Sequence, residues 1–225
     1  MFSDFLSLLF PRICELCNQG LAKREELICL KCLHELPRFK NDLPREEIYR
    51  HFVDSHLYHA FYAYLKFYKK GITQKLLHKI KYDRIPVLGE RIGYLLGTEI
   101  RHNDKDFSVD LVVPIPLHPK KLKKRGYNQS DFFARGLARA LNTQWSAKEI
   151  IRTTHNETQT NKTRQERINN VKGIFQVVAK NNIKNKHIML VDDVVTTGAT
   201  LESCAQEISE ARARYITLAV LAIAK

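Results

Sequence analysis

The sequence predicts an α/β fold in which a largely parallel sheet carries helices on both faces and follows a small four-cysteine ribbon. From about residue 71 onward, short apolar runs alternate with amphipathic stretches of helical length. This order is typical of a parallel sheet covered on both sides. Four of the five cysteines fall within residues 14–32, which predicts a separate metal-binding element before the sheet.

The region after residue 71 begins with two predicted helices. Residues 72–81 and 87–101 have helical patterns and are separated by Pro86. Residues 109–115 form a β-branched apolar run that ends among prolines, which predicts a buried strand leading into a loop. Residues 126–141 place apolar side chains at helical spacing and predict the next helix.

The C-terminal part repeats the alternation. Residues 174–178 and 187–191 are predicted strands, residues 201–212 a helix, and residues 215–223 a final strand. Between these elements and the preceding helix lies the polar tract 153–170, which contains almost no apolar residues. A long tract of this composition predicts a mobile loop.

Composition divides the chain into three parts. The aromatic run 61–68 alternates over several positions and predicts a strand or a hairpin arm. We therefore expect a zinc-ribbon domain at residues 1–40, a connecting arm or hood at residues 41–70, and the α/β domain at residues 71–225.

The net charge of +13 predicts an anionic partner, which could be phosphates, nucleic acid or an anionic membrane surface. A merely basic surface is the alternative. The apolar stretch 5–10 is too short to span a bilayer and lacks the basic leader and cleavage site of a signal peptide. We expect a short amphipathic helix there, no stable membrane insertion, and a cytoplasmic location, where thiols stay reduced.

The cysteines form two knuckles, Cys14-x-x-Cys17 and Cys29-x-x-Cys32, separated by eleven residues. A two-residue gap lets both thiolates of a pair bind one ion, and two pairs complete a tetrahedral site. Because protein ligands fill all four positions, the site predicts structural zinc. Cys204 stands alone in a predicted helix and is expected to be a small core residue.

An acidic pair and a glycine turn follow the apolar strand 188–191 directly. Asp192 and Asp193 come first, and the turn 196–200 leads into the next helix. Backbone N–H groups of such a turn can cradle a phosphate, and the helix adds its positive end. Two carboxylates accept hydrogen bonds from a diol such as ribose, and they also suit Mg²⁺ held through water. A plain helix cap beside two loop acids is the alternative.

These residues carry a resemblance. Residues 190–200 resemble the phosphoribosyl-diphosphate-binding motif of type I phosphoribosyltransferases, and the chain from Pro11 onward resembles the ComF family, named for its link to bacterial competence for DNA uptake. The resemblance implies a type I phosphoribosyltransferase-like parallel sheet with helices on both faces, preceded by a small four-cysteine zinc ribbon. It implies that phosphoribosyl diphosphate is bound by Val191, Asp192, Asp193, Val194, Val195, Thr196, Thr197, Gly198, Ala199 and Thr200.

A basic segment follows the strand 109–115, with five basic residues between Lys120 and Arg125. Alone, such a run predicts a solvated surface. The flanking residues 114–117 and 125–129 resemble the diphosphate loop of the ComF family, and this implies that Lys124, Arg125, Asn128 and Gln129 bind the diphosphate. Lys81-Tyr82 also resembles a ComF position, and no role follows from it.

The polar tract occupies the place of the lid that closes over the site in type I transferases and excludes water. Its residues Gln159, Thr160, Arg164, Arg167 and Asn170 resemble the ComF pattern. The resemblance implies that Arg164 and Arg167 meet the departing diphosphate. A disordered surface loop is the alternative.

One position departs from the purine-salvage relatives. Thr196 stands where those enzymes usually have an acidic residue that handles the proton of the base. The chain therefore does not resemble a hypoxanthine-guanine enzyme. The orotate and amido-transferring relatives do without that acid, so catalysis is not excluded.

The expected function is that of a phosphoribosyltransferase with substrate-borne Mg²⁺ and an unidentified acceptor, linked to nucleotide metabolism and DNA uptake. Asp192, Asp193, Arg125 and Arg164 are its expected catalytic residues. A related ribose 5-phosphate compound could be the ligand instead. The alternative is a non-catalytic single-stranded DNA-binding factor that uses the pocket for recognition and works with the DNA-uptake machinery.

Overall fold

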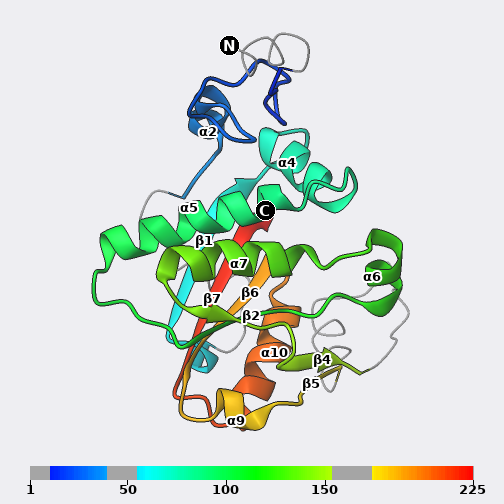
Figure 1. The fold of residues 1–225 in the computed structure, drawn as a ribbon. Helices are drawn as coiled ribbons and strands as arrows, with labels where there is room; N and C mark the ends of the chain where they lie inside the picture. The colour runs from blue at the N-terminus through cyan, green and yellow to red at the C-terminus, as the bar shows by residue number, and fades with distance from the viewer. Residues whose placement is uncertain (1–10, 40–54, 154–173, 225) are drawn as a thin grey trace, which may run out of the picture.

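The computed structural model describes residues 11–39, 55–153 and 174–224. A five-stranded sheet has the order β1-β7-β6-β2-β3, and every pairing in it is parallel (Figure 1). The strands are β1 (Ala60–Phe67), β2 (Leu111–Pro114), β3 (Gln144–Trp145), β6 (His187–Val195) and β7 (Tyr215–Ala224).

Helices cover both faces of this sheet, as the alternation predicted. α5 (Val87–Asn103) and α7 (Gln129–Leu141) pack together on one face, and α10 (Ala199–Glu210) lies on the other (Figure 1). Alternate residues of β6 enter different cores. Met189 packs with α5 and α7, whereas Leu190 packs with α10. A strand buried on both faces must be apolar throughout, which explains its continuous run.

Two predicted strands are present, but their pairing partners were not predicted. The aromatic run 61–68 contains β1, which pairs with β7 as an outer strand of the main sheet and is not a hairpin arm. The predicted strand 174–178 contains β5 (Phe175–Val177), which pairs antiparallel with β4 (Ile150–Arg152) in a separate two-stranded sheet. The domain boundaries at residues 40 and 70 stay predictions.

The basic run after β2 forms a helix, α6 (Pro119–Arg125), where the sequence predicted a loop. Pro119 suits the first helical turn, and His118 Nδ1 caps the helix by accepting from Lys120 N at 3.2 Å. Gly126 ends it in the left-handed conformation, with φ of 83°. The next helix therefore begins at Gln129 and not at residue 126.

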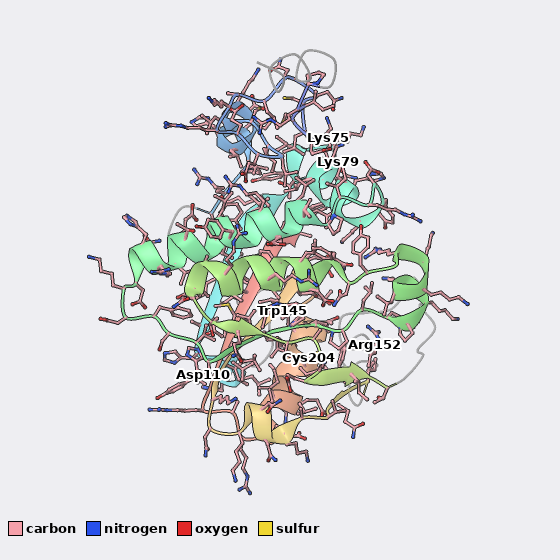
Figure 2. The ribbon with its side chains drawn as sticks, in the orientation of Figure 1. Lys75, Lys79, Asp110, Trp145, Arg152 and Cys204 are labelled. Carbon is pink, nitrogen blue, oxygen red and sulfur yellow. The ribbon has the colours of Figure 1, made fainter. Side chains whose placement is uncertain are left out.

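α4 (Ile72–Lys81) has the predicted bounds and connects the N-terminal region to the rest of the protein. That region contains the short helix α2 (Leu30–Glu35). Lys79 Nζ lies 3.1 Å from Glu15 Oε2, and Lys75 Nζ donates to the carbonyl oxygen of Leu16 (Figure 2). The remaining short helices are η1 (Ser55–Leu57) and α9 (Lys180–Ile183).

The remaining predictions concern the segment 5–10, the polar tract 153–170 and Cys204. The amphipathic helix at 5–10 and nearly all of the tract 153–170 lie outside the described residues. Cys204 lies on α10 and is fully buried in the core, as predicted. Within residues 11–39, 55–153 and 174–224, we find no helix whose length and apolar character would let it cross a bilayer.

Candidate functional site

The acidic pair lies at the C-terminal end of β6, which continues past the predicted end at residue 191 to Val195. Asp192 Oδ1 accepts from Ser130 Oγ at 3.1 Å and from the backbone N–H of Asp193 at 2.8 Å. Asp193 Oδ1 accepts from the backbone N–H of Val194 at 2.7 Å. Each carboxylate therefore has one oxygen fixed by the protein. Ligands of parallel sheets bind at this end of the strands.

Asp192 has an unusual acidity for a carboxyl group. Burial raises its pKa from 3.8 to about 7, and the neighbouring charge of Asp193 acts in the same direction. The hydrogen bond from Ser130 and the charge of Lys81 oppose this shift. Asp192 can therefore change its protonation state near neutral pH, whereas an ordinary aspartate does not.

Lys81 supplies the positive charge beside this pair. Its Nζ lies 2.7 Å from Asp193 Oδ2, and the two side chains are 21% and 10% exposed. No role for Lys81 followed from the sequence, although a signal was present. Lys81 follows the buried Leu77 by four residues, so it flanks the inward face of α4.

The turn after β6 forms a second hollow beside the acidic pair. Asp192 lines it together with four residues of the turn, which are Thr196, Thr197, Gly198 and Thr200. Gly198 has φ of 71°, a left-handed conformation that glycine adopts without strain. α10 begins at the next residue, so the positive end of a twelve-residue helix faces this hollow.

Cationic side chains line the other side of the main pocket, which contains both aspartates. They are Lys121, Arg125 and Arg152, and the imidazole of His118 lines the same pocket. Lys124, which the resemblance implied, lies exposed on α6 and is not among the lining residues.

Arg125 lines the pocket as the resemblance implied. Its Nη1 donates to Gln129 Oε1 at 2.7 Å, and its guanidinium lies 5.2 Å from the ring centroid of Tyr82. Gln129 itself is buried and also lines the pocket. Both contacts hold Arg125 at the rim of the pocket, where a fork of donors suits phosphate oxygens.

Asn128 lines the same pocket, but its side chain is committed to the protein. Its Nδ2 donates to the carbonyl oxygen of Ile115 at 3.0 Å and to Asp131 Oδ1 at 2.7 Å. Its Oδ1 accepts from the backbone N–H of Ser130 at 3.3 Å and so caps α7. The structure thus indicates that Asn128 positions Ser130, the donor to Asp192.

Arg152 also lines the pocket, and sequence reasoning did not predict a role for it. It ends β4, and its guanidinium lies 5.3 Å from the ring centroid of Phe175 (Figure 2). Its Nε is buried and has no hydrogen-bond partner among the described residues. The predicted lid begins directly after it, and Arg164 and Arg167 lie outside the described residues.

The four N-terminal cysteines form one cluster, and their Sγ atoms all lie within 4.8 Å of one another. Cys17 Sγ and Cys29 Sγ are 3.7 Å apart. Four thiolates around Zn²⁺ at about 2.3 Å are separated by about 3.8 Å, so the cluster can hold a metal such as zinc. Burial raises the pKa of Cys14, but N–H groups of Cys29, Cys17 and Leu16 outweigh this effect and lower it to about 7.

A family model and several curated proteins match part of this chain. The model for the phosphoribosyl transferase domain matches residues 124–225. Over 134 residues, the chain is 32% identical to the DNA utilization protein YhgH of Escherichia coli K12, and it is 29% identical over 135 residues to competence protein F of Haemophilus influenzae. The four-cysteine cluster precedes this matched region. Together, the names of these relatives and the four-cysteine cluster fit a ComF protein with a zinc ribbon.

The likeness covers part of each ComF relative. The match to the Escherichia coli protein includes 58% of this chain and 58% of that protein. Competence protein ComFC of Bacillus subtilis is 37% identical over 103 residues, which are 46% of this chain and 38% of the relative. The chain thus spans less than two thirds of the curated ComF relatives it matches.

Two solved structures are more distant from this chain. The allosteric regulatory enzyme of purine biosynthesis is 18% identical with a TM-score of 0.40, covering 59% of this chain and 26% of that one. Purine phosphoribosyltransferase from Pyrococcus horikoshii is 18% identical with a TM-score of 0.38, covering 60% and 73%. We take nothing about function from either likeness.

Proposed function

We propose that this ComF-like chain binds 5-phosphoribosyl-1-diphosphate with Mg²⁺ and transfers the phosphoribosyl group to an acceptor. The observation that carries the proposal is the placement of two carboxylates between a phosphate-cradling turn and a cluster of cations. A matching ligand carries a phosphate for the turn, a diol for the two carboxylates and a second anionic group for the cations.

Each part of the site takes one part of this ligand. The turn 196–200 binds the 5-phosphate through backbone N–H groups and hydroxyls. Asp192 and Asp193 accept hydrogen bonds from the ribose hydroxyls. Arg125 binds the diphosphate with help from Lys124, while Asn128 and Gln129 hold the segment in place. Arg164 and Arg167 are proposed to meet the leaving diphosphate from the lid.

The reaction breaks the bond between ribose C1 and the diphosphate oxygen, and a new bond forms between C1 and the acceptor. The bond electrons leave with the diphosphate, whose charge the pocket cations stabilise. Mg²⁺ would neutralise diphosphate charge, and the acidic pair fits it as a source of hard oxygen ligands held through water. Thr196 supplies no carboxylate. The acceptor must therefore react without a general base at position 196.

A turnover assay tests this function. The pure protein is incubated with phosphoribosyl diphosphate, Mg²⁺ and a panel of nucleobases and amines, and released diphosphate is measured. Acceptor-dependent release, abolished in a variant with Asp192→Ala and Asp193→Ala, supports the proposal. Absence of release across the panel, together with absence of binding, would contradict it.

A second candidate is single-stranded DNA binding, which the names of the relatives and one surface favour. α6 exposes four lysines on one seven-residue helix beside the pocket, and the chain carries a net charge of +13. This candidate predicts an affinity that falls steeply as salt rises. Lys120→Gln combined with Lys123→Gln should weaken binding and reduce the salt slope by about 2. Salt-independent binding would contradict it.

For the cysteine cluster, we propose that Cys14, Cys17, Cys29 and Cys32 hold structural zinc. The ligand set leaves no open position, so the ion would stabilise the fold and take no part in transfer. Zinc thiolates require reduced cysteines, which supports a cytoplasmic location.

A further inference from the structure

Lys81 and Asp193 form an ion pair inside the pocket in which any ligand must bind. Asp193 Oδ1 is already committed to the backbone N–H of Val194, so Oδ2 is the oxygen that remains for a ligand. Lys81 Nζ lies 2.7 Å from that atom. Among the described residues, Asp193 Oδ2 accepts no well-oriented hydrogen bond, so the ammonium is the contact that compensates its burial. A ligand hydroxyl that uses Oδ2 must therefore displace or share Lys81.

The backbone around Lys81 is held from two sides. The hydroxyl of Tyr127 donates to the carbonyl oxygen of Ile80, and the guanidinium of Arg125 lies over the ring of Tyr82. These contacts fix the end of α4, but they leave the lysine side chain with its own rotamers. A lysine is a point charge on a flexible stem, so its ammonium can change partner while the helix stays in place.

The two possible partners of the Lys81 ammonium, Asp193 and an anionic group of the ligand, would both lie within this pocket. Lys81 lines it together with Asp193, and Lys121 and Arg125 line it from α6, where an anionic ligand group would lie. An ammonium that leaves Asp193 can therefore reach a negative group of the ligand and remain paired. Breaking a partly buried ion pair without such an exchange is costly, because it leaves an uncompensated charge.

We propose that Lys81 is a transferable counter-ion that pairs with Asp193 in the empty pocket and moves to the ligand's phosphate oxygens when ligand hydroxyls occupy Asp193. If a ligand carries only an anionic group, Lys81 stays paired with Asp193 and is not available to bind it. If a ligand carries only hydroxyls, Asp193 stays paired with Lys81 and is not available either. A ligand that carries both groups satisfies both residues. Lys81 is thus a specificity-determining residue for phosphorylated sugars, an inference that rests on the proposed function.

Inorganic diphosphate without metal is the probe that isolates the anion-binding half of the exchange. Calorimetric titration at pH 8 compares the full-length wild type with Asp193→Asn. This substitution releases Lys81, so we expect diphosphate to bind about tenfold more tightly, the effect of one hydrogen bond to a charged group. Asp192→Asn removes a neighbouring charge that is not paired with Lys81, and it should give a clearly smaller gain.

The decisive comparison is the same substitution in two lysine backgrounds. In Lys81→Met, the gain from Asp193→Asn should disappear, because no ammonium is released. In Lys79→Met, the gain should persist, since Lys79 lies on the same helix and is also paired with an acid, but outside the pocket. A gain of equal size in the Lys81→Met background, or no gain in the wild type, overturns the proposal. Lys81→Gln is measured in the same way if Lys81→Met does not fold.

A second titration separates this inference from the proposed function. Lys81→Met should weaken binding of phosphoribosyl diphosphate with Mg²⁺ by about tenfold, because the exchanged contact is lost. If the wild type does not bind that ligand while the diphosphate coupling between Lys81 and Asp193 is present, the proposed function fails and the counter-ion exchange stands. If the wild type binds it but the coupling is absent, the exchange fails and the proposed function stands.

Discussion

At the scale of single residues, the site depends on a chain of hydrogen bonds that runs from Asn128 through Ser130 to the acidic pair. Asn128 caps α7 and so fixes Ser130, whose hydroxyl donates to Asp192. The same Asn128 donates to the carbonyl oxygen of Ile115, which joins the end of β2 to the start of α7. The resemblance implied a ligand contact for Asn128, and its partners instead indicate that it positions the acidic pair.

Replacing Asn128 tests this positioning role. Asn128→Ala should lower the free energy of unfolding by about 1–2 kcal/mol, because a helix cap and buried hydrogen bonds are lost. Asn128→Asp keeps the oxygen that caps α7 but loses the donation to the carbonyl oxygen of Ile115. If capping accounts for most of the stabilisation, Asn128→Asp should lower the free energy of unfolding by less than Asn128→Ala does. Denaturant unfolding measures both. Equal, negligible effects would contradict a positioning role.

The pKa of Asp192 makes a separate prediction about pH. The folded state raises this pKa from 3.8 to about 7, so it binds the proton more tightly than the unfolded state does. The resulting stability is fully present below pH 3.8 and is lost as pH rises through about 7. Asp192→Asn cannot ionise, so its Tm relative to wild type should rise over this window. A Tm difference that does not change with pH would contradict the raised pKa.

At the scale of elements, the sequence was informative where periodicity is strong and local. α4 has the predicted bounds, and the strands of the buried sheet centre follow from their apolar runs. The sequence did not predict the helix α6, because five basic residues predict solvent exposure equally well in a loop or in a helix. The cap from His118 favours the helix. The pairing of β5 with β4 depends on contacts that no local pattern records.

The same limit applies to the site. The residues around Asp192 share a continuous segment, so a motif could single them out. Most of them line the pocket or its neighbouring hollow, whereas Val191 and Ala199 are buried and line neither. Lys81 and Arg152 reach the pocket from other elements, α4 and β4. Only the fold brings such residues together, and a single sequence carries little information on which distant side chains meet.

The contact between α5 and α7 gives a prediction at this scale. A Cβ at Gly136 would lie 2.0 Å from the carbonyl oxygen of Glu90, whereas a Cβ at Gly89 would meet nothing closer than 3.7 Å. Gly136→Ala should therefore destabilise the protein by about 3 kcal/mol or more, through forced separation of the helices. Gly89→Ala should stay within about 1 kcal/mol of wild type, with helix propensity in its favour. Similar unfolding midpoints for the two variants would refute this packing.

At the scale of the whole molecule, α4 links the metal-binding region to the pocket. Lys75 and Lys79 contact the segment that carries the first cysteine pair, and Lys81 ends the same helix at Asp193. α4 is thus one of the elements that join the N-terminal region to the α/β domain, together with β1, which pairs with Phe39, and α5, whose Glu99 pairs with Arg38. The ribbon would support the wall of the pocket without lining it.

Removing the metal tests this arrangement. Cys32→Ala should abolish bound zinc and lower the Tm by about 2–4 °C for each kcal/mol of lost stability. Cys204→Ala is the matched control, because Cys204 is buried in the core away from the cluster and should leave the zinc content unchanged. Metal analysis and thermal unfolding give both readouts. Full zinc content in Cys32→Ala would contradict the proposed ligand set.

The most direct test of the account is equilibrium binding of phosphoribosyl diphosphate with Mg²⁺ to the full-length protein. The site predicts saturable binding by the wild type and a loss of at least about a hundredfold when Asp192→Ala and Asp193→Ala are combined, since two charge-assisted contacts disappear. The double variant should retain its zinc and its secondary structure. Wild-type binding that is absent, or that survives the double substitution unchanged, would contradict the account.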